Sequence, residues 1–185
     1  MKRLFIAIKI HPSEKLRALV SALKRDLIDD KIKWVELHNL HMTLKFLGDT
    51  PEAHIPEIVR QVRRSCRDIP PFTLTLKDTG IFGSRYKPRV IWCGTMPDPA
   101  MKKLIRNLYA NLETIGIEPG RQNVVPHLTL GRIKYIANKK HFQDVLDANR
   151  PGVIQESRVD EFYLLASTLR SQGPVHEIME TFRLD

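Results

Sequence analysis

The chain carries the tetrapeptide His-x-Thr-Leu twice, first at His41 and again at His127. In a β-strand, residues two apart point to the same face and lie about 6.5–7 Å from each other. Each copy therefore presents an imidazole together with the hydroxyl of Thr43 or Thr129. Two imidazoles can share the acid and base roles of phosphodiester cleavage, because an unperturbed pKa of about 6.5 suits both roles. Threonine hydroxyls can donate hydrogen bonds to phosphate oxygens in the transition state. The pattern predicts phosphodiester chemistry that needs no metal.

The two copies belong to a longer internal repeat. The offset from His41 to His127 is 86 residues, and the offset from Arg3, which opens RLFI, to Arg89, which opens RVIW, is also 86. A shared offset favours two lobes that follow one βαβαβ plan and are related by a pseudo-two-fold axis, with a cleft between them. We expect one two-lobed domain over residues 1–185, with lobe 1 at about 1–87 and lobe 2 at about 88–185. The C-terminal strand could cross back. A single copy of the motif would carry little weight, since histidine and threonine both suit a half-exposed strand.

Hydrophobic periodicity indicates which elements hold the motifs. Apolar runs predict strands at residues 4–10, 34–35, 40–47, 72–76, 89–94, 125–133, 159–165 and 175–184. Apolar residues at helical spacing predict helices at residues 16–27, 55–62, 101–115 and 142–146. Both motifs therefore fall on strands, and each strand is followed by a helix.

Composition bounds the class of protein and of partner. Apolar residues make up 42% of the chain, which is enough for a core and argues against disorder. The 30 Lys and Arg against 21 Asp and Glu leave a net charge of +9. A basic surface favours phosphate-bearing partners, although a protein can also be basic without binding them.

The chain shows no sign of export or of a membrane span. Cys66 and Cys93 are far apart and form no metal or redox motif, so we expect reduced, buried residues in a cytoplasmic protein. The apolar run at the N-terminus is short, and Lys9 interrupts it, unlike a signal peptide. No run approaches the eighteen or more apolar residues that a membrane span needs.

The motifs and their flanks resemble a known family. The segments RLFIAI, NLHMTLKFLG, VIWCG, VPHLTLGR and STLRSQGPV are similar to those of the RNA 2′,3′-cyclic phosphodiesterases, also called 2′-5′ RNA ligases, of the two-histidine phosphoesterase superfamily. The resemblance implies a bilobal α+β fold in which two antiparallel-type sheets flank a central cleft, with helices outside. It implies hydrolysis of a 2′,3′-cyclic phosphate RNA end to a 2′-phosphate without a cofactor. Ligation of 2′-5′ ends would be the reverse, secondary reaction.

The resemblance also implies roles for the motif residues. His41 would be the general acid at the 3′ oxygen and His127 the base that activates water, although the residues themselves leave the order of the two roles open. Thr43 and Thr129 would hold phosphate oxygens. The chain departs from the family at His176, where other members often have tyrosine, which puts any cleft-edge role of that tyrosine in doubt here.

Three further residues could contribute to the site. Arg132 follows the second motif, and Gly131 before it permits a bulge that would swing the guanidinium onto phosphate, whereas strict alternation places Arg132 on the opposite face from His127. Lys45 would continue the face of His41, or would be a solvated lysine at a strand end. Phe5 could stack on a nucleobase or could belong to the core.

Other patterns argue against different site chemistry. His38 and His41 would face opposite ways on a strand, and no carboxylate or cysteine completes a zinc set. The glycines form no phosphate-binding loop of the ATPase type, and Trp34 and Trp92 are expected to be core or rim residues. We expect His11, His54 and His141 to be exposed.

The sequence favours an enzyme over two other classes. The alternatives are a non-catalytic nucleotide- or RNA-binding module that uses the same cleft, and an interaction scaffold whose repeat is only architectural. Both motif histidines are present, which favours the enzyme. The expected partners are RNA with a 2′,3′-cyclic phosphate end, tRNA fragments among them, or a small cyclic nucleotide, and the protein is expected to be a monomer.

Overall fold

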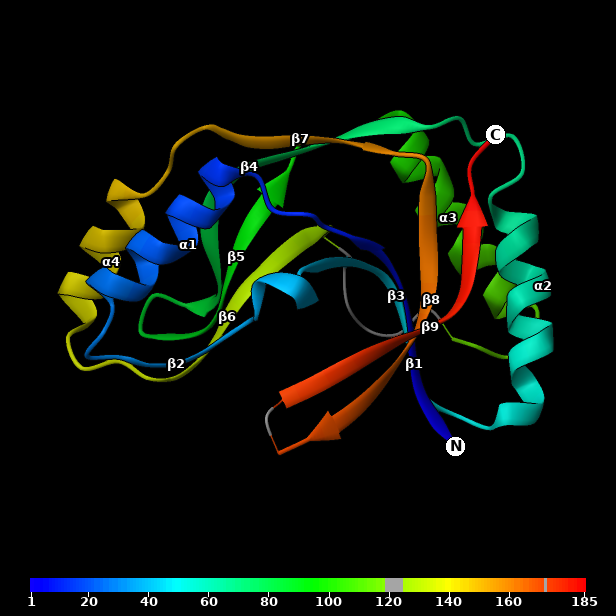
Figure 1. Cartoon of the computed structure of the whole chain (residues 1–185), viewed down its shortest axis with the longest axis horizontal. Coiled ribbons are helices and arrows are strands. Elements are labelled where there is room, and N and C mark those ends of the chain that lie inside the picture. The colour runs from blue at the N-terminus through cyan, green and yellow to red at the C-terminus, as the bar shows by residue number, and fades with distance from the viewer. Residues whose placement is uncertain (119–124, 172) are drawn as a thin grey trace.

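A nine-stranded sheet runs through the computed structural model, which describes residues 1–118, 125–171 and 173–185 (Figure 1). The strand order is β7-β4-β5-β6-β3-β1-β8-β9, and β2 pairs with β6 off this path. All of the pairings are antiparallel. The strands are β1 (Lys2–Lys9), β2 (Lys31–Trp34), β3 (His41–Thr50), β4 (Phe72–Ser84), β5 (Lys87–Thr95), β6 (His127–Tyr135), β7 (Val153–Val159), β8 (Glu161–Arg170) and β9 (Gly173–Arg183).

Four α-helices lie outside the curled sheet, two on each side (Figure 1). The pair α1 (Glu14–Asp26) and α4 (Lys139–Ala148) packs on the half that contains β7. The pair α2 (Ile55–Ser65) and α3 (Pro99–Glu113) packs on the half that contains β3 and β9. One face of the sheet is therefore covered by helices, and we call the other, which carries the His-Thr pairs, the open face.

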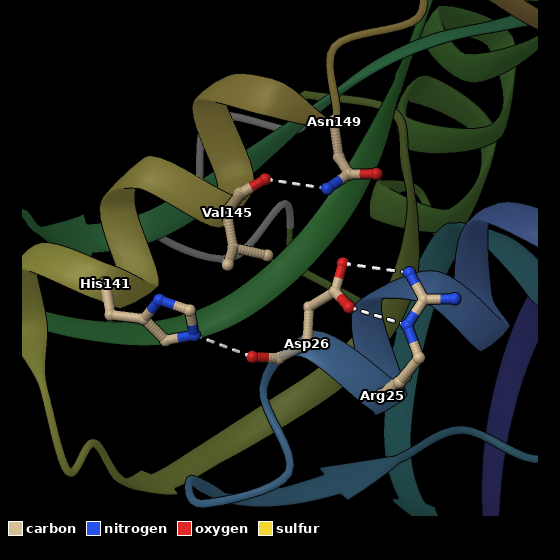
Figure 2. Close-up of polar contacts among 5 residues, drawn as sticks. All are labelled: Arg25, Asp26, His141, Val145 and Asn149. Atoms are coloured by element: carbon tan, nitrogen blue, oxygen red, sulfur yellow. Dashed lines mark hydrogen bonds and ion pairs between the residues drawn. The ribbon is translucent and has the colours of Figure 1, made fainter.

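Local signals explain where the helices begin. The side chain of Ser13 accepts a hydrogen bond from the Leu16 amide at 3.2 Å, and Asp98 caps the Met101 amide at 2.9 Å. Such caps satisfy amides that have no partner inside the helix. In α4, the capped His141 also donates from Nε2 to the Asp26 carbonyl of α1 at 2.8 Å (Figure 2). This histidine therefore ties two helices together.

The two halves of the sheet do not correspond to the two halves of the sequence. The predicted boundary near residues 87–88 falls at the start of β5, yet β4 before it pairs with β5 and β7 after it. On the other side, β8 and β9 return to β1. The expected two sheets are also one continuous sheet, because β3 and β6 are joined at Met42 and Leu128. The antiparallel α+β class itself is confirmed.

The internal repeat is real, but its first strand is offset by 85 residues rather than 86. Thr43 pairs with Ala7, and Thr129 pairs with Trp92, so the offset is 92 − 7 = 85 in β1 and β5 while it is 129 − 43 = 86 in β3 and β6. The predicted match of RLFI with RVIW is therefore wrong by one residue. A shift of one residue exchanges the two faces of a strand, so the error matters for every side chain in β1.

The predicted strand at residues 159–165 corresponds mainly to β8, which runs over Glu161–Arg170. The chain turns at Asp160 between β7 and β8, and β7 was not predicted. Its sequence, VIQESRV, holds only three apolar residues, which is typical of an edge strand such as this one.

The core lies between the helices and the covered face of the sheet, and both cysteines are part of it. Cys66 and Cys93 are buried and unpaired, as expected. Burial raises the pKa of the Cys93 thiol to about 12. None of the described helices combines the length and apolar character that a membrane crossing requires.

Candidate active site

The two His-Thr pairs meet where β3 crosses β6. Met42 and Leu128 pair directly, and both side chains are fully buried on the helix-covered face. An antiparallel register about this pair sets His41 across from Thr129, and Thr43 across from His127. Residues directly opposite have Cβ atoms about 4.5–5.5 Å apart, and diagonal ones such as the two histidines are separated by roughly 7–8 Å. Each imidazole thus lies beside the hydroxyl of the other motif, around one pseudo-two-fold axis.

Both imidazoles are held in the same tautomer by the same contact. His41 Nδ1 lies 2.7 Å from the carbonyl oxygen of Asn39, and His127 Nδ1 lies 2.7 Å from that of Val125. A carbonyl oxygen can only accept, so each Nδ1 must carry a proton and donate it. Nε2 of each ring is then left free to take up or release a proton.

Aromatic rings support each imidazole. The His41 ring lies 5.0 Å from the ring of Phe5 and 5.0 Å from that of His176, and the His127 ring lies 4.6 Å from that of Phe82. Phe5 is only 3% exposed. Its ring packs against those of His41 and His176, and its burial leaves no free face for a nucleobase. The sequence allowed base stacking or packing for this residue, and the structure shows packing.

The surroundings of His41 disfavour its charged form. Burial lowers the pKa of His41 most, and the positive charges of Arg132 and His127 lower it further, while the hydrogen bond to Asn39 opposes them. The pKa of His176 is lowered to about 4, again first by burial and then by His41 and other cations. In both cases burial is the larger cause and nearby cations add to it, so a bound anion would favour the charged form of each ring.

A β-bulge in β6 brings Arg132 onto the open face. Trp92 pairs with Thr129, and the next pair is Ile91 with Gly131, so Leu130 has no partner in the ladder. The extra residue shifts the alternation, and Arg132 projects from the same face as Thr129. At this point β2 packs closely on β6, since a Cβ on Gly131 would lie 2.8 Å from Ile32 Cγ2.

The same bulge in β3 moves Lys45 away from the site. Ala7 pairs with Thr43 and Ile6 pairs with Lys45, so the lysine projects from the helix-covered face. It is 4% exposed, and its Nζ donates to the Glu118 carbonyl at 2.6 Å and lies 4.3 Å from the Tyr109 ring centre. The predictions that it continues the face of His41, or is solvated at a strand end, are both wrong. Burial lowers its pKa, and Glu113 partly opposes this.

Phe46 takes the open-face position that Lys45 was expected to fill. It pairs with Phe5, it is 52% exposed, and the Arg3 guanidinium lies 5.2 Å from its ring centre. It is also the repeat counterpart of Arg132, because 132 − 46 = 86. The sequence analysis missed Phe46. The bulge in β3 that exposes it is equivalent to the bulge in β6, which was predicted from Gly131.

A pocket of about 200 Å³ opens beside His41. Its lining comes from four separate segments of the chain and comprises Lys9, His38, Asn39, Leu40, His41, Leu165, Val175 and His176. His38 lies on a 3-10 turn, Leu37–Asn39, rather than on a strand, so it lines the same pocket as His41 instead of facing away. No group of three histidine, cysteine or acidic side chains that could hold a metal ion is found among the described residues.

Comparisons with known proteins cover nearly the whole chain. A family model described as LigT like Phosphoesterase matches residues 8–92 and 96–176. The RNA 2′,3′-cyclic phosphodiesterase of Methanothermobacter thermautotrophicus is 34% identical over 184 residues, which cover 98% of each chain. The protein of the same name from Thermotoga maritima is 33% identical and covers 96% of this chain and 92% of its own.

Solved structures share the fold. TT0787 of Thermus thermophilus superposes with a TM-score of 0.78 at 30% identity, covering 98% of this chain and 97% of its own. Escherichia coli LigT complexed with 3′-AMP superposes with a TM-score of 0.73 at 24% identity, covering 99% of this chain and 97% of its own. The curled-sheet fold is therefore shared with proteins whose sequences have diverged widely from this one.

Proposed function

The chain belongs to the LigT-like phosphoesterases, and on this premise we propose that it hydrolyses RNA 2′,3′-cyclic phosphate ends to 2′-phosphates. Relatives named RNA 2′,3′-cyclic phosphodiesterase that match nearly end to end support this enzyme class. The observation that carries the proposal is the matched pair of imidazoles, each with Nδ1 tied to a carbonyl and Nε2 left free.

Two imidazoles related by a pseudo-two-fold axis suit an in-line displacement at phosphorus. His127 Nε2 takes a proton from water, and the water oxygen forms a bond to phosphorus. The bond from phosphorus to the 3′ oxygen breaks on the opposite side, and protonated His41 gives its Nε2 proton to that oxygen. The product carries a 3′ hydroxyl and a 2′-phosphate. Each proton transfer contributes about 10²–10⁴ in rate.

The lowered pKa of His41 is compatible with a general acid that becomes protonated when the substrate binds. In the free enzyme, burial and neighbouring cations favour the neutral ring. A bound cyclic phosphate adds a negative charge beside it, which favours the protonated ring and raises its pKa. His41 would then be protonated when a leaving group is present to receive the proton.

The remaining open-face groups stabilise the phosphate. Thr43 and Thr129 flank the two imidazoles and donate hydrogen bonds to non-bridging oxygens. Arg132 adds a charged fork that can hold two oxygens at once. These groups would stabilise the negative charge on the non-bridging phosphate oxygens in the transition state without a metal ion. The reverse reaction, joining of 2′-5′ ends, would use the same groups in the opposite order.

The test uses a short RNA that ends in a 2′,3′-cyclic phosphate, in the presence of EDTA. Wild type is expected to give a 2′-phosphate, identified by mass and by sensitivity to phosphatase and nuclease. His41→Ala and His127→Ala are each expected to lose at least about 10²-fold in kcat. Binding of the RNA without turnover by wild type would instead support a non-catalytic binding module.

A further inference from the structure

The pocket beside His41 gathers three basic side chains that the proposed chemistry does not use. Lys9 ends β1, His38 lies on the 3-10 turn before β3, and His176 lies near the start of β9. The turn is fixed against β9, because Asn39 Nδ2 donates to the Pro174 carbonyl at 3.1 Å. Three segments that are distant in sequence are thus held around one small cavity.

The pocket is lined by basic side chains without an acidic partner among the described residues. Burial lowers the pKa of His176 most, and the charges that lower it further come from His41 on β3, Lys9 on β1 and His38 on the turn. An anion bound beside these basic side chains would favour their protonated forms and would be held by them.

The position of the pocket identifies the anion. A 2′,3′-cyclic phosphate occupies O2′ and O3′ of the terminal ribose, so any second phosphate on that nucleotide must be on O5′. His41 itself lines the pocket, and the His176 ring lies 5.0 Å from the His41 ring, so the pocket adjoins the reacting group and can receive the next phosphate along the chain. Its volume of about 200 Å³ is below the roughly 300–1,000 Å³ typical of sites for whole drug-sized ligands, and suits a phosphate rather than a nucleotide.

We propose that the pocket formed by Lys9, His38 and His176 binds the phosphate on O5′ of the terminal nucleotide. This inference rests on the proposed function, since it takes the cyclic phosphate to lie between His41 and His127. The enzyme would then bind both phosphates of the terminal nucleotide. It would prefer RNA ends to nucleoside 2′,3′-cyclic phosphates that have a free 5′ hydroxyl.

The test compares two dinucleotides with the same 2′,3′-cyclic end, one joined by a phosphodiester and one by an uncharged methylphosphonate. For wild type, kcat/KM is expected to be about tenfold higher with the phosphodiester, the size of one charge-assisted hydrogen bond. Lys9→Met should abolish this preference, and His176→Gln should reduce it. Lys140→Met, which removes an equal charge from exposed α4, should retain it.

A second pair of substrates separates the two sources of such a phosphate. Cyclic mononucleotides with and without a 5′-phosphate show whether a terminal monophosphate is accepted as well as a diester, and a preference for either kind of phosphate supports the site. Equal kcat/KM within both pairs of substrates in wild type would overturn it. A Lys9→Met variant that slows both dinucleotides equally would also overturn it.

Failure of the proposed function would give a different result. If neither dinucleotide were cleaved, the hydrolase proposal would fail, and equilibrium binding of the same two molecules would decide the pocket. Tighter binding of the phosphodiester would support the phosphate site, and equal binding would exclude it.

Discussion

Substitution of Gly131 by alanine tests whether the bulge in β6 positions Arg132. A Cβ on Gly131 would lie 2.8 Å from Ile32 Cγ2 and 3.0 Å from Trp34 Cε3, so these side chains or the strands that carry them must shift. Overpacking of this kind costs about 1–3 kcal/mol. At about 2–4 °C per kcal/mol for a chain of this size, we expect Tm to fall by roughly 2–12 °C.

The effect on activity should act through the arginine. If the bulge shifts, the guanidinium loses its contact with phosphate, which is worth about 1.5–3 kcal/mol or about 10- to 150-fold in kcat/KM. Arg132→Met should give the same loss of activity without the loss of stability. The double variant should be as active as Arg132→Met alone, because the same contact is removed only once.

The assay is a four-way comparison of kcat/KM on an RNA with a cyclic phosphate end, together with thermal melting. The reasoning fails if Gly131→Ala keeps wild-type kcat/KM while Tm falls. It also fails if the fold-decrease in kcat/KM of the double variant equals the product of the fold-decreases of the two single variants. The two residues would then act independently.

Three further substitutions test other parts of the structure. Phe46→Ala should weaken RNA binding by about 1–3 kcal/mol if the exposed ring stacks on a base, and it should change stability little. Phe5→Ala should instead lower the unfolding free energy by about 3–5 kcal/mol. Oligonucleotide titration measures the first effect, and urea unfolding measures the second. Lys45→Met should leave kcat unchanged and leave unfolding free energy equal or higher, because its buried charge has no carboxylate partner among the described residues; a large loss of activity would refute its placement. His176 has a pKa of about 4 when folded and about 6.5 when unfolded, so the unfolding free energy should fall as pH drops from about 6.5 to 4. His176→Gln should flatten this dependence of the unfolding free energy on pH, as measured by urea unfolding. An unchanged pH dependence would contradict the burial of His176.

The central pair of the site could be read from the sequence because it depends on local rules. Alternation along a strand places His41 with Thr43, and the repeat places a second pair on an equivalent strand. The placement of Arg132 needed one more residue, and Gly131 supplied the sign of a bulge. These features depend on neighbours only a few residues away.

The errors come from features that no local pattern records. The bulge in β3 carries no glycine, so the face of Lys45 was predicted wrongly and Phe46 was missed. The one-residue difference between offsets 85 and 86 hid which face of β1 carries Phe5.

The sequence analysis allowed for a C-terminal strand that crosses back, but it did not predict the other exchanges of strands between the halves. The return of β8 and β9 to β1, and the pairing of β4 with β7, are contacts between distant segments. The pocket beside His41 depends on this return, because β9 supplies His176. Periodicity predicts that a strand exists, but its partners are chosen by the packing of the whole sheet.

The division of proton transfer between the two histidines can be measured directly with a substrate whose 3′ oxygen is replaced by sulfur. A thiolate leaves without receiving a proton, so His41→Ala should recover most of its lost kcat with the sulfur substrate, while His127→Ala should remain slow with both substrates. Rescue of His127→Ala instead, or equal defects of both variants with sulfur and with oxygen, would contradict the proposed acid and base.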